Sequence, residues 1–187
     1  MPLPTNQLAA GLAMFALSAS AATSSDSCIG NFCLYKPLTE KQFVHQYGRG
    51  EVRRDDYNTD VRYRCFYERD FGRWVQFQFS NHGAESAHLE AVMIGKTELC
   101  SARHRTRRPM NLRMGQGIAL GMKEGEVIEK LGRPTRKQPL VPEPHNSIFD
   151  SRYGDHALVY ETDHSLLLSV VYLKDGKVTN YLISNSE

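Results

Sequence analysis

Acidic and histidine side chains are the residues of this sequence whose types could support metal binding. Asp56, Asn58 and Asp60 form a D-x-N-x-D pattern, which begins a calcium loop when glycine follows and a bidentate glutamate comes later. Val61 occupies the glycine position, so the pattern favours a solvated loop. The seven histidines show neither H-x-x-x-H nor H-E-x-x-H spacing, so they predict no zinc site. We therefore expect neither a metal nor another cofactor.

Two pairs of carboxylates could act as general acid and base, namely Glu68 with Asp70 and Glu161 with Asp163. Both pairs fall at the tips of expected hairpins, where acidic side chains are common because they stabilise turns. The sequence contains no G-x-S-x-G, S-x-x-K or phosphate-loop pattern, which are motifs of nucleophilic and phosphoryl-transfer enzymes. We expect a protein without catalytic activity, and a hydrolase is the alternative within the enzyme class.

The cysteines predict disulfides. Cys28, Cys33, Cys65 and Cys100 are an even number without a C-x-x-C pair, which argues against a redox pair or a zinc knuckle. Four cysteines allow three connectivities. Glycine and asparagine lie between the first two and can form a turn, so we prefer Cys28–Cys33 together with Cys65–Cys100. Disulfides of this kind are typical of proteins in oxidising compartments.

The apolar run Leu8–Ala22 is typical of a secretory signal peptide. It is shorter than the roughly 20 residues of a membrane-spanning helix, and it ends in small residues with an A-x-A site at Ala19–Ala21. The preceding segment, Met1–Gln7, lacks the usual Lys or Arg, and no lipid-attachment signal precedes Cys28. We expect a cleaved signal peptide over residues 1–22, a periplasmic location and no membrane span.

Charge is nearly balanced along the chain except in one segment. The 187 residues carry 23 Lys and Arg against 21 Asp and Glu, with a net charge of +2 and a mean hydropathy of −0.46. These values are typical of globular proteins and argue against a nucleic-acid binder. The exception is a basic stretch of Arg103, Arg105, Arg107 and Arg108, with Arg113 nearby. It is either a solvated linker or a contact for an anionic partner, such as an acidic protein face or lipid head groups.

Two segments of similar sequence predict the elements that would position these residues. Leu38–Gly50 and Met122–Pro134 share apolar positions one helical turn apart and a Gly-Arg ending. Each predicts a short helix that ends at its glycine, and Thr39 resembles the first residue of a capping box. The turn Lys174–Lys177, with Asp-Gly at its centre, predicts a hairpin. Three strands are expected after each helix, over about 60–69, 73–80, 86–94, 156–162, 166–174 and 177–184.

The first hairpin decides which side chains we expect on a binding face. A three-residue turn over Asp70–Gly72 places Tyr67 opposite Val75 and directs the only tryptophan, Trp74, away from the helices. An aromatic residue set among polar ones is typical of an interface anchor. The alternative is that the other unit or a terminal segment covers this face. The predicted binding face comprises Trp74, Phe66, Arg64, Glu68, Gln76 and Gln78, extended by the apolar residues Val159, Leu167 and Val171.

The order of elements resembles the beta-lactamase inhibitory protein fold. The segment Gly117–Pro134, followed by Ala157–Glu161 and the hairpin at Asp175–Val178, is similar to the outer-membrane assembly lipoprotein domain of the SmpA/OmlA type. The spacing G-M-x-x-x-x-V-x-x-x-L-G-x-P carries this likeness. The resemblance implies an α+β fold of two tandem repeats, each with short helices packed on a three- to four-stranded antiparallel sheet, and protein binding without catalysis. The repeats would span 23–100 and 117–187, with a basic linker over 101–116.

Taken together, the sequence predicts an exported, non-enzymatic protein-binding module whose partner is another envelope or secreted protein. Inhibition of a periplasmic or secreted enzyme is one form of this function. A role in the assembly or maintenance of the cell envelope at the outer membrane is the alternative, and no nucleic-acid partner is expected.

The leader generates a first prediction. The chain expressed with its leader should lose about 21 or 22 residues, because the A-x-A site directs cleavage. N-terminal sequencing of the protein recovered from the periplasmic fraction measures this. Recovery of the intact N-terminus from the cytosol would contradict the prediction.

Overall fold

The computed structural model describes residues 28–34, 36, 38–55, 58–81, 86–101, 103–110, 112–114, 117–142, 147–162 and 165–185. The predicted leader over 1–22 lies outside these residues, as do Asp56 of the D-x-N-x-D pattern and Asp163.

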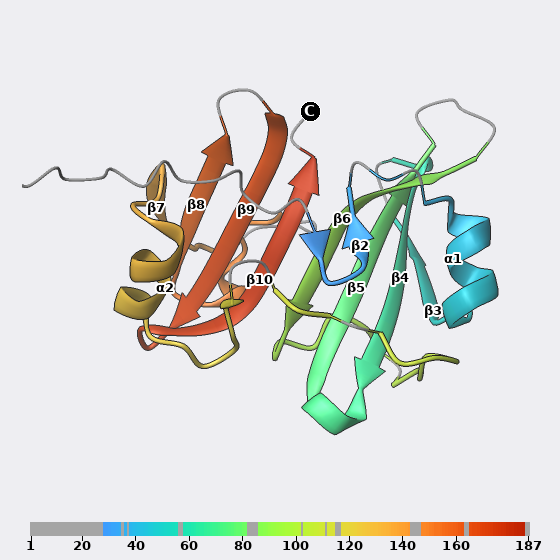
Figure 1. Ribbon diagram of the computed structural model, residues 1–187, viewed down its shortest axis with the longest axis horizontal. Helices are drawn as coiled ribbons and strands as arrows, with labels where there is room; N and C mark the ends of the chain where they lie inside the picture. Colours follow the sequence, from blue (N-terminus) through green and yellow to red (C-terminus); the bar gives the residue numbers. More distant parts are fainter. Residues whose placement is uncertain are drawn as a thin grey trace, which may run out of the picture.

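An eight-stranded antiparallel sheet forms the centre of the described structure, in the order β3-β4-β5-β6-β10-β9-β8-β7 (Figure 1). Strands that follow one another in the chain are neighbours in the sheet, with one exception. β6 is followed in the chain by β7 but pairs with β10. A second sheet holds two strands, β1 and β2. The strands are β1 (Cys28–Ile29), β2 (Phe32–Cys33), β3 (Glu51–Arg54), β4 (Val61–Glu68), β5 (Arg73–Ser80), β6 (His88–Gly95), β7 (Arg136–Pro139), β8 (His156–Thr162), β9 (Ser165–Lys174) and β10 (Lys177–Asn185).

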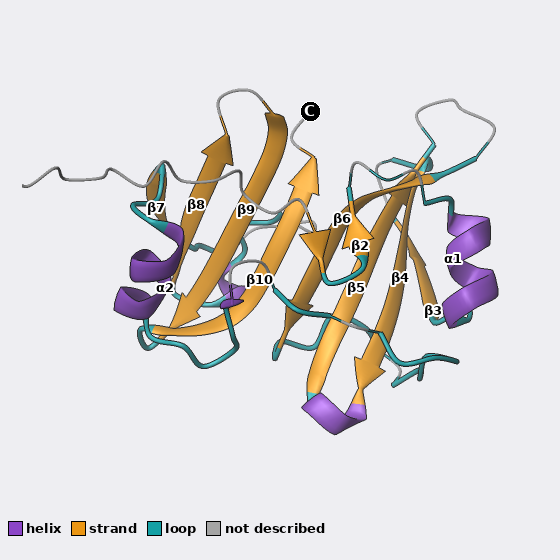
Figure 2. Ribbon diagram, in the orientation of Figure 1, coloured by secondary structure: helices purple, strands orange, loops and turns teal. Residues whose placement is uncertain are grey.

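Two α-helices, α1 (Glu40–Tyr47) and α2 (Glu124–Leu131), lie near the two ends of this sheet (Figure 1). The expected capping box at the start of α1 is confirmed, since the Thr39 side chain accepts a hydrogen bond from the Gln42 amide and the Gln42 side chain reaches back to the Thr39 amide. Both helices end at a glycine in the positive-φ region, as the sequence predicts. The structure also describes the 3₁₀ turns Arg69–Phe71 and Ser151–Tyr153 (Figure 2).

The predicted fold class, α+β with two tandem repeats of short helices on a three- to four-stranded sheet, is wrong. The structure is mostly β, and its strands join one continuous antiparallel sheet. The joint is the antiparallel pairing of β6 with β10, where Ile94 lies opposite Tyr181 and Val92 opposite Ile183. Two separate sheets would expose unpaired backbone groups along both of these strands, and their pairing satisfies those groups. The eight-residue helices cover only part of so wide a sheet.

The preferred disulfide connectivity is confirmed. Cys28 is bonded to Cys33 across the β1–β2 pair, and Cys65 on β4 is bonded to Cys100 in the loop after β6. The four cysteines are therefore all oxidised, which is typical of proteins outside reducing compartments. Among the described residues no helix is long and apolar enough to cross a membrane.

One face of the large sheet packs against the helices and the N-terminal hairpin. Phe43 of α1, Val127 of α2 and Phe32 of β2 are all buried in this layer. Phe77 of β5 is a centre of the cluster, since its ring centroid lies 4.8 Å from that of Phe32 and 4.6 Å from that of Phe43. Met110, Leu112, Met114 and Ile118 from the segment before α2 extend the same layer.

The opposite face of the sheet is buried as well, by loops instead of helices. Leu99 and Cys100 cover it from the loop after β6, and Leu140 and Tyr153 cover it from the connection between β7 and β8. The Cys65–Cys100 disulfide fixes the first of these loops to β4. This cover explains why the sequence shows apolar residues on both faces of its strands.

The register of the β4–β5 hairpin differs from the prediction by one residue. The strands close at Glu68 opposite Arg73, and Tyr67 lies opposite Trp74 instead of Val75. Four residues form the turn, namely the 3₁₀ turn Arg69–Phe71 and Gly72, which adopts the left-handed conformation with φ 59°. Because side chains alternate along a strand, a shift of one residue on one strand changes which residues share a face.

Trp74 lies on the face away from the helices, as predicted, but the loops that cover this face make it a core residue. Its exposed fraction is 5%, and its ring centroid lies 4.9 Å from that of Tyr67. We expect Trp74→Ala to lower the free energy of unfolding by about 3–5 kcal/mol, because it leaves a cavity in a packed layer. Urea unfolding followed by circular dichroism measures this.

Phe71→Ala is the matched control for this prediction, since that side chain is 66% exposed and its loss should cost less than about 1 kcal/mol. Equal stability of Trp74→Ala and the wild type would show that Trp74 is not part of the core.

Candidate functional site

The structure does not bring the predicted binding residues together on one surface. Trp74, Gln76, Gln78 and Val159 lie on the loop-covered face, and Trp74 and Val159 are buried there. The remaining apolar members, Phe66, Leu167 and Val171, are buried in the layer on the helix side.

The two charged members of the predicted set have partners within the fold. Arg64 forms an ion pair with Glu40 at the start of α1, with 2.5 Å between Nη2 and Oε1. Glu68 forms one with Arg73, with 2.5 Å between Oε2 and Nε. In each pair both side chains are at least 89% buried, so these charges stabilise contacts between elements and are not displayed to a partner.

A small crevice lies between the sheet and the loops that cover it. Its volume is about 60 Å³, and Tyr63, Gln76 and Gln78 line its floor. The Tyr63 hydroxyl donates a hydrogen bond of 3.2 Å to Asp55. Burial, and then the Asp55 carboxylate, raise the pKa of Tyr63 above its usual range. A crevice of this size is too small for most organic ligands.

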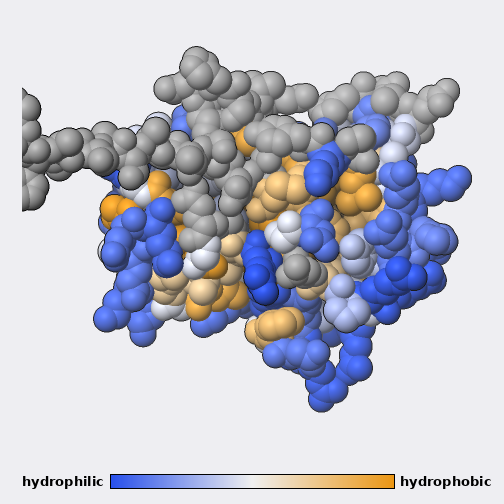
Figure 3. All heavy atoms as spheres, in the orientation of Figure 1, coloured by the Kyte–Doolittle hydropathy of each residue, from blue (hydrophilic) through white to orange (hydrophobic). Residues whose placement is uncertain are grey.

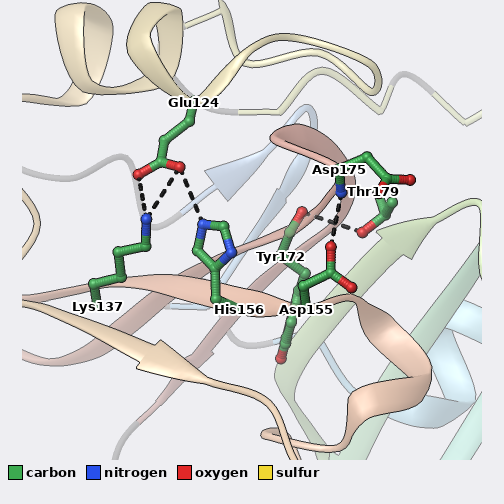
Figure 4. A network of polar contacts seen from close by, with 7 residues as sticks. All are labelled: Glu124, Lys137, Asp155, His156, Tyr172, Asp175 and Thr179. Atoms are coloured by element: carbon green, nitrogen blue, oxygen red, sulfur yellow. Dashed lines mark hydrogen bonds and ion pairs between the residues drawn. The ribbon is translucent and has the colours of Figure 1, made fainter.

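Glu124, Lys137 and His156 form a polar cluster at the other end of the sheet (Figure 4). Lys137 Nζ lies 2.9 Å from Glu124 Oε1, and His156 Nε2 lies 3.1 Å from Oε2. Hydrogen bonds from Lys137 and His156 hold the pKa of the Glu124 carboxyl below its ordinary value. The cluster connects the first residue of α2 to β7 and β8, which is a structural role.

The tip of the β4–β5 hairpin has a different character, because it projects beyond the sheet (Figure 2). Phe71 at this tip is 66% exposed, a larger fraction than that of Val52, Ile128 or Val141, the other large apolar residues that are exposed in the described structure. Gly72, with its positive φ, ends the short turn on which Phe71 lies. An exposed aromatic side chain at a fixed position is a feature of binding surfaces.

The Phe71 ring packs against the side chain of Arg73. The Arg73 guanidinium lies 4.6 Å from the centroid of the Phe71 ring, and its Nη2 donates a hydrogen bond of 3.2 Å to the Leu112 carbonyl. Together with the ion pair to Glu68, these contacts join the hairpin to the segment before α2. Burial raises the pKa of Glu68 against the opposing effect of Arg73. The side chain that contacts the aromatic ring is therefore itself held by an ion pair and a hydrogen bond.

The predicted basic stretch runs alongside this hairpin. The Tyr67 amide donates to the His104 carbonyl and the Arg107 amide to the Tyr47 carbonyl, both at 2.9 Å. Arg103 lies over the Tyr67 ring at 4.8 Å. These contacts hold the stretch beside the end of β4 and the end of α1, so it is not a free linker. Five exposed arginines gather around the tip, namely Arg69, Arg105, Arg107, Arg108 and Arg113.

Recesses adjoin Phe71 on two sides. A cleft of about 240 Å³ lies between the hairpin tip and residues 105–110. A more open groove of about 350 Å³ is lined by Phe71 together with the apolar residues Leu112, Met114, Ile118 and Leu120. We call Phe71, the five arginines and these two recesses the hairpin-tip surface. Hydrophilic residues predominate on the projecting hairpin, whereas apolar residues gather over the middle of the sheet (Figure 3).

The sequence held a signal for the arginines of this surface but not for Phe71. The basic stretch was recognisable as a run of cations. Phe71 lies in both the predicted and the observed turn, but its exposure depends on what packs against the hairpin tip. Among the residues that the structure describes, no group of three or more His, Cys, Asp or Glu could hold a metal ion.

Comparisons with known proteins add little to this site. No family model and no curated protein matches the chain. One solved structure, an extracellular protein containing a SCP domain from Bacillus anthracis str. Ames, aligns with a TM-score of 0.45 and 9% identity. The alignment covers 99% of this chain and 50% of that one, so the chain spans half the length of that protein. A likeness at this level carries no argument, and the resemblance to the inhibitory-protein and SmpA/OmlA families stays a prediction.

The Glu124 cluster generates a prediction about pH. Because the folded-state pKa of Glu124 is lowered, its ionised form stabilises the fold above the ordinary value of 4.5, and this contribution is lost as the pH falls through the lowered value. We expect Glu124→Gln to be less stable than the wild type at neutral pH. The difference in stability should shrink as the pH falls from 4.5 through the lowered pKa of Glu124. Urea unfolding across acidic pH measures it. The exposed Glu129 provides the control variant Glu129→Gln, and a difference for Glu124→Gln that does not vary with pH would refute the role of the ion pairs.

Proposed function

We propose that this protein is an exported, non-enzymatic binding protein and that the hairpin-tip surface is its contact with another envelope or secreted protein. The partner's activity would be inhibited or directed by this contact, and inhibition of a periplasmic or secreted enzyme is the form we favour.

The exposure of Phe71 is the observation that carries the proposal. Truncation of a large aromatic residue at the centre of an interface commonly costs 2 kcal/mol or more of binding free energy. Phe71 has the support that such an anchor requires, because Arg73 holds its ring at 4.6 Å and is itself paired with Glu68. The recesses on two sides of the ring offer places for side chains of a partner.

The other polar clusters support a binding role over a catalytic one. Glu40, Glu68 and Glu124 are each paired with a cation from a neighbouring element, so they hold the fold together. The disulfides support export, and the leader predicted over residues 1–22 would deliver the chain to that compartment.

A binding experiment tests the proposal. The mature protein is used to capture a partner from an envelope extract, and the partner is identified by mass spectrometry, purified and titrated against wild-type protein and Phe71→Ala. We expect Phe71→Ala to weaken the affinity about 30-fold, which corresponds to about 2 kcal/mol.

Val141→Ala is the control variant, since Val141 is a 48% exposed apolar residue that does not line the recesses of the hairpin-tip surface. It should bind the partner as the wild type does. Unchanged affinity of Phe71→Ala, with the fold intact by circular dichroism, would show that the hairpin-tip surface is not the contact.

A further inference from the structure

We infer that the partner presents an acidic segment to the hairpin-tip surface, with carboxylates over the cleft arginines and an apolar side chain in the groove beside Phe71. This inference rests on the proposed function and adds the chemistry of the partner to it.

The charge of the surface is the first argument. The whole chain has a net charge of only +2, yet five exposed arginines surround the tip against one exposed carboxylate of the turn, Asp70. The other acidic residue of the hairpin, Glu68, is buried in its ion pair with Arg73. Within the described part of the chain, none of the five arginines forms an ion pair with an acidic side chain of the fold. Their charge is available to an anionic partner.

The type of cation is the second argument. All five are arginine, whose planar guanidinium donates two parallel hydrogen bonds to one carboxylate. Arg105, Arg107 and Arg108 line the cleft together, so consecutive carboxylates of one segment could each meet a guanidinium there. The positions of these arginines are set by the backbone hydrogen bonds that fix the stretch beside β4 and α1.

The recesses favour a protein segment over a lipid surface. The groove on the second side of Phe71 is lined by Leu112, Met114, Ile118 and Leu120, and its apolar walls lie beside the ring. A single apolar side chain next to the acidic ones would fill this groove and gain hydrophobic free energy. A flat layer of lipid head groups would contact the arginines but leave the groove unfilled.

Titration with short fluorescent peptides tests the inference. One peptide alternates Asp and Glu around a central Leu, a second replaces the acidic residues by Asn and Gln, and a third replaces Leu by Ser. Vesicles of phosphatidylglycerol or phosphatidylcholine are the lipid probes. We expect the first peptide to bind at low ionic strength, the other two to bind about tenfold more weakly or not at all, and added salt to weaken binding.

Paired double variants isolate the arginines. Arg105→Gln/Arg108→Gln removes two exposed cations of the cleft, and Lys41→Gln/Arg133→Gln removes two exposed cations elsewhere. We expect the first variant to bind the acidic peptide about tenfold more weakly and the second to bind it within about twofold of the wild type. Unfolding curves of both variants confirm that the fold is retained.

The outcomes separate this inference from the proposed function. Equal loss in the two double variants, equal binding of the amide peptide, or binding of anionic vesicles without binding of the acidic peptide would overturn the acidic-segment inference. If Phe71→Ala still weakens binding of the purified partner in that case, the proposed function stands without the acidic-segment inference. If Phe71→Ala leaves the partner's affinity unchanged, the proposed function fails as well.

Discussion

The β4–β5 hairpin closes on Glu68 and Arg73, whose carboxylate and guanidinium lie 2.5 Å apart and largely out of solvent. This closure leaves four residues for the turn and sets the register of β4 against β5. On one side it places Phe77 and Phe66 under α1, and on the other it places Trp74 under the loop that Cys100 fixes to β4. A buried ion pair adds little net stability by itself, but breaking it leaves an unpaired charge and is costly. The pair therefore acts mainly to select the observed register. A shift of β4 by one residue would move the side chains of β4 to the other face of the sheet.

The same closure produces the binding surface that we propose. With Glu68 paired, Arg73 is oriented so that its guanidinium also meets the Phe71 ring and the Leu112 carbonyl. These contacts join the hairpin tip to the segment before α2, while the basic stretch is joined to β4 and α1 by backbone hydrogen bonds. The exposed ring, the arginines and the recesses thus lie on segments that these contacts join. Stability and presentation of the surface depend on the same few contacts.

Local signals in the sequence were sufficient for much of the secondary structure. The Thr39 cap, the helix-ending glycines and the Asp175–Gly176 turn, in which both residues have positive φ, all lie where the sequence predicts them. Strands β3 and β7 were missed because each has only four residues, most of them charged or polar, and shows no regular alternation of apolar and polar side chains. The joining of β6 to β10 was missed because pairing between distant strands leaves no local signature. The candidate site was missed for a similar reason, since the loops that bury Trp74 come from distant parts of the chain and leave no local signature.

Trp74 is the only tryptophan, so its fluorescence tests directly whether the loops bury its face of the sheet while the hairpin tip is exposed. Iodide, which does not enter packed protein, should scarcely quench the wild type, whose indole is 5% exposed. The double variant Trp74→Phe/Phe71→Trp moves the single indole to the hairpin tip, where iodide should quench it efficiently. Efficient quenching of the wild type and protection of the indole in the double variant would contradict the account, because they would place Trp74 on the surface and residue 71 in the core.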